Sequence, residues 1–271
     1  MRIEIMVLHI AIEGVDGVGK TTQLEHLKTF FTKKKYKVTI IKQPNTPELI
    51  KFMQDYFLQQ EELALIMAVD RLITYNAMKH FFHYYDIVFW DRSILSSYAY
   101  NTNENVDDKF ITDINRYFPD MDLYIVIDNN EFLEKSDYQK DTVADEQKII
   151  MKYQKLVSEN NNVKSIPYIN GEENKVFESI VQTIYEYFPR CNWCGHVFKK
   201  TTENRKYCKK SCSDYAREEQ NRKNALEHYH KHKDEKPPRL GSYGANLHSH
   251  MNPDHEKEKQ LIANEKRRLR I

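Results

Sequence analysis

The feature that most constrains this chain is an uninterrupted match to G-x-x-x-x-G-K-[ST] at residues 14–21, GVDGVGKT. An apolar run, Ile3–Glu13, precedes it, and a segment of helical character, Thr21–Lys34, follows. In a strand–loop–helix of this kind, glycines bring backbone N–H groups against phosphate oxygens, and the helix directs its positive end at the same site. Lys20 should reach the β- and γ-phosphates, and the Thr21 hydroxyl should ligate Mg²⁺. The residues predicted to hold the nucleotide are Gly14, Asp16, Gly17, Val18, Gly19, Lys20, Thr21 and Thr22.

Strand and helix patterns alternate over the first 189 residues. Further strands are expected at Tyr36–Lys42, Asp86–Trp90, Asp122–Asp128 and Lys164–Ile169, and helices at Glu48–Gln59, Glu61–Tyr84, Ile94–Tyr100, Asp145–Asn160 and Asn174–Phe188. Such alternation predicts an α/β fold of the P-loop NTPase type, with helices on both faces of a parallel sheet. No apolar run reaches the roughly eighteen residues of a membrane span, and the apolar start lacks the features of a signal peptide. We therefore expect no membrane partner.

Charge is distributed unevenly along the chain, although the net charge is only +1. Residues 1–189 contain 21 Lys and Arg against 29 Asp and Glu, whereas residues 190–271 contain 20 against 11. The change in composition predicts a first domain at 1–189, a small cysteine-rich module at 190–215, and a charged, partly helical tail at 216–271.

The opening segment, IEGVDGVGKTTQ at residues 12–23, resembles that of thymidylate kinases. Three later segments resemble the same family in the same order: Ala64–Arg71, Asp91–Tyr100 and Pro119–Asp128. The resemblance covers residues 7–188 and implies a kinase that transfers a phosphoryl group from ATP to dTMP or a related deoxynucleoside monophosphate. It also implies a homodimer.

The resemblance further implies roles for individual residues. Asp91, expected at the carboxyl end of the third strand, would help to hold Mg²⁺, and Arg92 would clamp the acceptor phosphate with its planar fork of donors. Together with Lys20 and Lys140 they form the expected catalytic set. The expected acceptor-binding residues are Met67, Arg71, Arg92, Ser97, Tyr100 and Asn101. The alternatives are a surface salt bridge for Arg71, a local ion pair for Asp91 and Arg92, and plain helix packing for the residues after them.

The chain departs from the family pattern in several places. Residues 129–147 contain no arginine, so Lys140 would replace the usual catalytic cation of the lid. The family's Arg-Glu-Pro is Lys42-Gln43-Pro44, the expected base-stacking aromatic is Met67, and the aromatic after Asp-Arg is Ser93. These changes leave the acceptor base open.

All four cysteines lie within residues 191–212, in the spacing C-x2-C…C-x3-C. Four thiolates at this spacing predict a tetrahedral zinc site, and clustered cysteines without a secretory leader favour a reducing, cytoplasmic setting. The predicted zinc ligands are Cys191, Cys194, Cys208 and Cys212.

Basic and aromatic residues alternate around the cysteines, and this pattern is typical of contact with nucleic acid. A stabilising cap or a protein-docking module is the other interpretation. Three functional hypotheses therefore stand. The first is a Mg²⁺- and ATP-dependent nucleoside monophosphate kinase, and the second is an enzyme of the same fold with a different acceptor, such as another deoxynucleotide or a nucleic-acid end. The third is a nucleic-acid-binding protein with a weakly active or inactive kinase domain.

Overall fold

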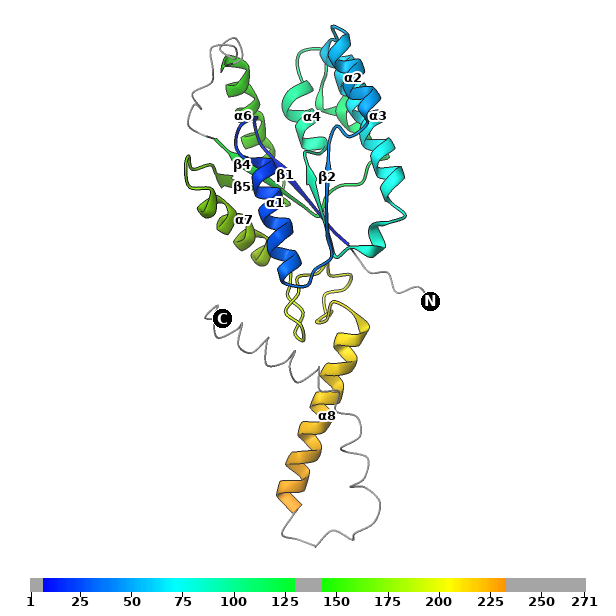
Figure 1. Ribbon diagram of the computed structural model, residues 1–271, viewed down its shortest axis with the longest axis vertical. Coiled ribbons are helices and arrows are strands. Elements are labelled where there is room, and N and C mark those ends of the chain that lie inside the picture. Colours follow the sequence, from blue (N-terminus) through cyan, green and yellow to red (C-terminus); the bar gives the residue numbers. More distant parts are fainter. Residues whose placement is uncertain (1–6, 130–142, 233–271) are drawn as a thin grey trace. The chain divides into compact units, whose positions relative to one another are not determined.

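The computed structural model describes residues 7–129 and 143–232 (Figure 1). The chain divides into two compact units, one of Met1–Pro189 with Val197–Thr201, and one of Arg190–His196 with Thr202–Ile271. A short piece of the predicted cysteine module therefore belongs to the first unit. The domain boundaries proposed after residues 189 and 215 stay predictions.

The first unit is built on a five-stranded parallel sheet of order β2-β3-β1-β4-β5. The strands are β1 (Leu8–Glu13), β2 (Val38–Lys42), β3 (Ile87–Asp91), β4 (Leu123–Asp128) and β5 (Val163–Pro167). The central strand β1 lies between β3 and β4, so the chain order reverses beside it. In open α/β sheets, ligands bind at the carboxyl ends of the strands at such a point. The predicted α/β fold is confirmed.

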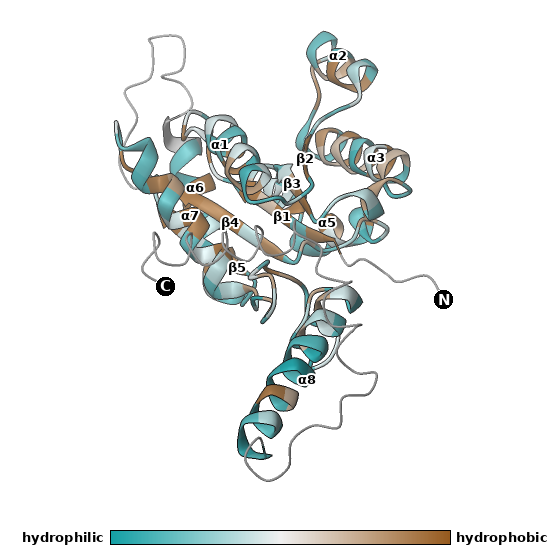
Figure 2. Cartoon of the chain, turned by 60° about the horizontal axis from the view of Figure 1, so that its bottom comes forward, coloured by the Kyte–Doolittle hydropathy of each residue, from teal (hydrophilic) through white to brown (hydrophobic). Residues whose placement is uncertain are grey.

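Alternating side chains of the strands build two hydrophobic cores, one on each face of the sheet. In β3, Ile87 and Phe89 belong to one core, whereas Val88 and Trp90 belong to the other. All four are completely buried. The central strands are therefore largely hydrophobic on both faces, as is typical of a parallel sheet covered on both sides; Figure 2 shows much of β4 in brown.

Helices cover both faces. Buried residues of α1 (Lys20–Lys33) and α7 (Glu173–Tyr187) contribute to the first core. Residues of α3 (Gln60–Met78), α4 (Ile94–Asn101), α5 (Asp108–Asn115) and α6 (Val143–Glu159) contribute to the second. The short α2 (Pro47–Asp55) has no buried residue.

The helix predictions misplaced some boundaries and missed one helix: the helix expected over Glu48–Gln59 is α2, which ends at Asp55. The helix expected over Glu61–Tyr84 ends at Met78, and a separate 3-10 turn covers Phe82–Tyr84. Helix α5 was not expected at all. It begins after Asp107, whose side chain caps it by accepting a hydrogen bond from the backbone N–H of Phe110 at 2.7 Å.

The segment Val197–Thr201 packs within the first unit. Val197 is buried in the core beside α1 and α7, and its N–H donates to the Tyr36 hydroxyl at 2.8 Å. Lys199 forms an ion pair with Asp122, which precedes β4. Tyr36 and Asp122 each lie just before the strand that follows them. This segment is therefore a structural part of the sheet domain.

The second unit contains a cysteine cluster and α8 (Lys210–His232). Cys212 is the one buried residue of this helix, which is largely hydrophilic in Figure 2. Within residues 7–129 and 143–232, no helix is long and apolar enough to cross a membrane.

Candidate active site

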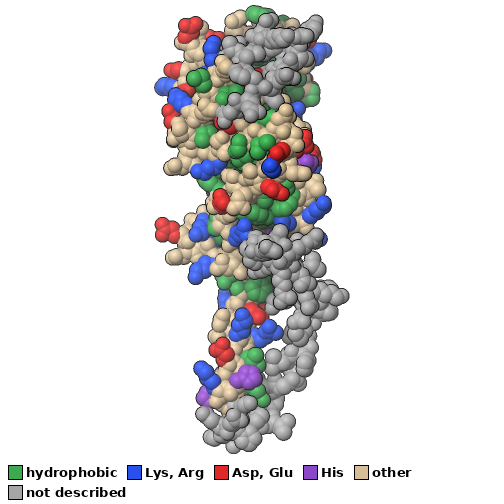
Figure 3. Space-filling view, turned by 90° about the vertical axis from the view of Figure 1, so that its left-hand side faces the viewer, with side chains coloured by type: hydrophobic (Ala, Val, Ile, Leu, Met, Phe, Trp, Pro, Cys, Tyr) green, Lys and Arg blue, Asp and Glu red, His purple; other side chains and the backbone are tan. Residues whose placement is uncertain are grey.

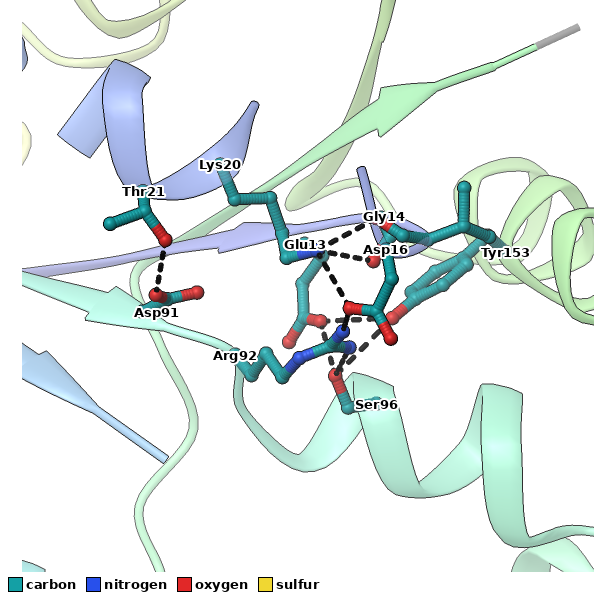
Figure 4. A network of polar contacts seen from close by, with 10 residues as sticks. Glu13, Gly14, Asp16, Lys20, Thr21, Asp91, Arg92, Ser96 and Tyr153 are labelled. Atoms are coloured by element: carbon teal, nitrogen blue, oxygen red, sulfur yellow. Dashed lines mark hydrogen bonds and ion pairs between the residues drawn. The ribbon is translucent and has the colours of Figure 1, made fainter. Parts of the chain in front are cut away.

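The phosphate loop connects β1 to α1 at the carboxyl edge of the sheet (Figure 4). Gly14 has φ of +135°, and a Cβ at this position would lie 2.6 Å from the carbonyl oxygen of Ile127. No larger residue fits there without moving β4. Val15 and Val18 turn into the core and are at most 3% exposed. The two buried valines therefore fix the loop to the hydrophobic core, and the loop leads directly into α1.

Lys20 is the first residue of α1 and is 7% exposed. Its ammonium group donates to the carbonyl oxygens of Gly14 at 3.1 Å and Val15 at 2.7 Å. Burial, and then the positive charge of Arg92, lower the pKa of Lys20 to about 8, against the opposing effect of Asp16 at 3.7 Å. The loop thus folds around a cation whose closest acceptors are neutral carbonyl oxygens, and charged phosphate oxygens would be better acceptors for it.

The Thr21 hydroxyl lies 3.4 Å from Oδ2 of Asp91, the last residue of β3. Asp91 is 5% exposed, and the pairing of β1 with β3 places it opposite Ile12. A hydroxyl and a carboxylate are hard oxygen ligands of the kind that Mg²⁺ prefers. The chemistry of this pair fits the predicted magnesium site.

Arg92 follows β3 in a left-handed backbone conformation, with φ of +73°. Such a conformation costs a non-glycine residue about 1–3 kcal/mol and is concentrated at functional sites. The guanidinium forms an ion pair with Asp16 and lies 5.0 Å from the centre of the Tyr100 ring. Burial acts to raise the pKa of Asp16, but Arg92 and Lys20 outweigh it and hold that pKa below its usual value. Asp16 and Arg92 are therefore both charged at neutral pH.

Glu13, the last residue of β1, is a completely buried carboxylate. It accepts hydrogen bonds from the hydroxyls of Ser93, Ser96 and Tyr153, the last two at 2.7 and 3.0 Å. Ser96 also accepts from Arg92 at 3.3 Å. The network ties the end of β1 to α4 and α6 and sets the position of the strand end on which the phosphate loop begins.

A second polar cluster surrounds Arg71 of α3, which has no exposed surface. Its guanidinium donates four hydrogen bonds, to Gln43 Oε1 (3.1 Å), Asn115 Oδ1 (3.0 Å), Ser93 O (3.0 Å) and Ser97 Oγ (2.8 Å). Burial lowers the pKa of Arg71 to about 10, a shift that Glu13 and Asp70 oppose. The alternative of a surface Arg is wrong, because Arg71 is a buried link between α3, α4, α5 and the residue after β2.

The other predicted acceptor residues lie on the same helices. Met67 is half-buried one turn before Arg71, and Asn101 donates to Gln60 at 3.1 Å. Ser97 and Tyr100 contact Arg71 and Arg92 respectively. Lys140 lies outside the described residues. The structure thus forms one cluster at the phosphate loop and one around Arg71, joined through Ser93, and among the described residues it records no contact of Met67 or Asn101 with either arginine.

Sequence reasoning missed three participants. Tyr153 bonds Glu13 from 140 positions along the chain, and Asn115 reaches Arg71 from the unpredicted helix α5. Gln43 was noticed as a departure from the family pattern but not as a partner of Arg71. Nothing in the local sequence marks Tyr153 or Asn115, since both sit among ordinary helical residues.

In the second unit, the four cysteine sulfurs lie within 4.8 Å of one another. Cys194 and Cys208 are 3.5 Å apart, so they are thiols rather than a disulfide. The backbone around Cys191 and Cys194 forms a tight turn. The N–H of Cys191 donates to the carbonyl oxygen of His196 at 2.8 Å, and the N–H of Gly195 donates to the carbonyl oxygen of Cys191 at 2.9 Å. Four convergent sulfurs are a donor set that fits tetrahedral Zn²⁺.

Comparison with known proteins identifies relatives of the first unit. The family described as thymidylate kinase matches residues 12–184. A probable thymidylate kinase of Methanosphaera stadtmanae is 32% identical over 196 residues, covering 66% of this chain and 98% of its own. Another, from Saccharolobus solfataricus, is 32% identical over 183 residues, covering 65% of this chain and 95% of its own.

Solved structures agree on the fold. A thymidylate kinase from Ehrlichia chaffeensis superimposes with a TM-score of 0.55 at 21% identity, covering 65% of this chain and 98% of its own. One from Candida albicans gives 0.54 at 16% identity, covering 72% and 96%.

Proposed function

Because this chain belongs to the thymidylate kinase family, we propose that it transfers the γ-phosphoryl group of ATP to dTMP. The observation that carries the proposal is the convergence of Lys20, Asp91 and Arg92 on one phosphate loop at the carboxyl edge of the sheet. The rival hypothesis, a nucleic-acid-binding protein with an inactive kinase domain, is not favoured, because the relatives match this chain over nearly their full length.

The proposed roles follow from charge and position. The backbone from Gly14 to Thr22 holds the phosphates of ATP, and Lys20 leaves its weak carbonyl partners for the β- and γ-phosphate oxygens. Thr21 and Asp91 would hold Mg²⁺, which would supply charge neutralisation at the transferring phosphoryl group. Arg92 exchanges Asp16 for the phosphate of the acceptor, since both are anions within reach of the same guanidinium. Phosphoryl transfer relies on this kind of positioning and electrostatic stabilisation.

The acceptor nucleoside is proposed to bind over α3 and α4, beside Met67, Ser97, Tyr100 and Asn101. Arg71 still has one N–H without a partner among the described residues, after four of its five are used. Because it has no exposed surface, a base reaches it only when the side chains that cover it move. Lys140 is proposed as the lid cation, as residues 129–147 contain no arginine.

The test is ADP release from ATP and Mg²⁺ across a panel of nucleoside monophosphates. Wild type should prefer dTMP, and Lys20→Ala should abolish turnover. Lys28→Ala is the matched control, because Lys28 is exposed on the same helix. Turnover that survives Lys20→Ala would refute the phosphate-loop assignment.

We propose that the cysteine cluster binds one Zn²⁺ through Cys191, Cys194, Cys208 and Cys212. The close approach of the four sulfurs supports it. A folded module this poor in buried apolar residues depends on its metal for stability. Thiol ligands of this kind persist in a reducing compartment, which supports a cytoplasmic location.

A homodimer is proposed through the outer face of α3. Leu65, Val69 and Ile73 recur every fourth residue on this helix and are 45, 48 and 47% exposed. Together they form an apolar stripe of the kind that marks an interface. Val69→Glu with Ile73→Glu should convert a dimer to a monomer in light scattering. Met151→Glu, at an exposed position of α6, should not.

A second candidate function belongs to the second unit, contact with nucleic acid. The cations and aromatic rings around the cysteines support it, and it is independent of the kinase activity.

A further inference from the structure

A basic hollow lies on the second unit, beside the cysteine cluster. It has a volume of about 380 Å³ and is lined by Asn204, Arg205, Lys206, Tyr207, Lys209, Lys210 and Ser213. Four of these seven residues are cations and none is acidic. Figure 3 shows that Lys and Arg side chains are frequent on the visible face of this unit.

The cations of the hollow are held in two different ways. Arg205 is half-buried and fixed, because its guanidinium donates to the carbonyl oxygens of Tyr207 at 3.0 Å and Cys208 at 2.6 Å. Lys206, Lys209 and Lys210 are exposed, and none of them forms an ion pair with the part of the chain that the structure describes. The hollow thus presents unneutralised positive charge around one rigid guanidinium.

Helix α8 adds to this potential. It begins at Lys210 and has no acidic residue in its first turn. The free N–H groups of a helix start carry partial positive charge, which favours an anion in the same place. Asn204 and Ser213 add neutral hydrogen-bond donors to the lining.

Tyr207 indicates which anion the hollow takes. Tyr207 is the aromatic residue among those that line the hollow, whereas Trp193 and Tyr215 of the same unit stack on each other with ring centres 6.0 Å apart. A cationic surface with an aromatic ring is the combination that holds the backbone of a single strand and stacks on a base. A free phosphate would need the cations but not the ring.

We propose that this hollow binds one backbone phosphate of single-stranded nucleic acid, with the adjacent base against Tyr207. The inference deepens the proposed nucleic-acid contact of the second unit and rests on it. The competing explanation is that the cations only offset the negative charge of a zinc ion with four thiolates, which would make them structural.

The experiment measures the binding of fluorescein-labelled single-stranded DNA, single-stranded RNA and duplex DNA to the full chain by fluorescence anisotropy over a range of salt concentrations. Lys206→Glu with Lys210→Glu should weaken single-strand binding about tenfold or more. The same variant should flatten the slope of log K against log salt by about 0.7 for each backbone phosphate that the protein no longer neutralises.

The matched control is Lys223→Glu with Lys231→Glu, which makes the same charge change at exposed positions further along α8. An equal loss in this control, or no binding by wild type, would overturn the site. Zinc content and dTMP turnover are measured on every variant, so a failed kinase proposal is seen separately.

If the double Lys variant loses zinc, two substitutions of Tyr207 test the site instead. Tyr207→Phe should keep the affinity for single strands, and Tyr207→Leu should lower it severalfold. If Tyr207→Leu binds like wild type, or if duplex DNA binds as tightly as single strands, the proposal is wrong.

Discussion

Replacing Arg71 by Met should destabilise the first unit severely while nearly preserving side-chain length. The change removes four hydrogen bonds at once, and it leaves the acceptors on Gln43, Asn115 and Ser93 without their donor in a site with no solvent exposure. A buried acceptor left unsatisfied costs about 1–3 kcal/mol. The Ser97 hydroxyl oxygen also loses this donor, but it is left out of the estimate because a hydroxyl can form a hydrogen bond as a donor instead.

Removing a buried charge also relieves a cost. Burial lowers the pKa of Arg71 to about 10, so holding the guanidinium charged is already unfavourable. Glu13 opposes that effect, however, and loses a compensating cation in the variant. Breaking one partner out of a buried charged network costs about 3–5 kcal/mol. We therefore expect a loss of about 4 kcal/mol in the free energy of unfolding, a large part of the roughly 5–15 kcal/mol of a typical domain.

The assay is urea denaturation followed by circular dichroism, with zinc present throughout. Arg116→Met is the control, because Arg116 is exposed and its recorded hydrogen bond and cation–π contact within the described part of the chain are both with the neighbouring Tyr117. It should change the unfolding free energy by less than about 0.5 kcal/mol. A loss below about 1 kcal/mol for Arg71→Met would refute the reasoning, since it would mean that the four bonds are not made in a dry environment.

Three further predictions concern pH, packing and metal. Burial lowers the pKa of Lys20 to about 8, so its positive charge is lost as pH rises through that value, and kcat/KM for ATP should fall there. Lys20→Arg should remove this fall in kcat/KM at high pH, and a wild-type kcat/KM that stays constant well above pH 8 would contradict the assignment. Tyr36→Phe should lower the unfolding free energy by about 1–3 kcal/mol, because the buried N–H of Val197 loses its hydrogen-bond acceptor. The control is Tyr56→Phe at an exposed position, which should leave the unfolding free energy unchanged. Equal stability of the two variants in urea would mean that the hydrogen bond is absent. Chelation should release one zinc per chain, measured with a chromogenic chelator. It should leave dTMP turnover intact, because every residue proposed for the chemistry lies in the first unit. Loss of turnover together with zinc would show that the activity of the first unit depends on the second.

Local patterns in the sequence predicted the sheet domain well. The central strands are short apolar runs, and the phosphate loop is contiguous, so β1, the loop and α1 are all specified within residues 8–33. Asp91 and Arg92 could be placed because a parallel strand ends where they begin. These features depend on neighbours in the sequence.

What the sequence hid depends on distant pairs. The burial of Arg71 needs Gln43, Asn115 and Ser97, which lie 28, 44 and 26 positions away. The sequence of an amphipathic helix does not indicate whether an arginine in it faces water or a buried set of hydrogen-bond acceptors. Helix α5 was missed for a related reason, because its buried positions are only Ile111 and Asn115, too few for a clear period.

The packing of Val197–Thr201 into the first unit has a consequence for dissecting this protein. The segment stands between Cys194 and Cys208, so the chain leaves the cysteine module, contributes Val197 and Phe198 to the other unit at 5% exposure each, and returns. Cutting after Pro189 would therefore strip two core side chains from the enzyme and uncover apolar surface on the sheet domain. A shortened enzyme would be prone to aggregate for a reason unrelated to catalysis. A cleaner dissection keeps residues through 201 and replaces Cys191 and Cys194 with serine.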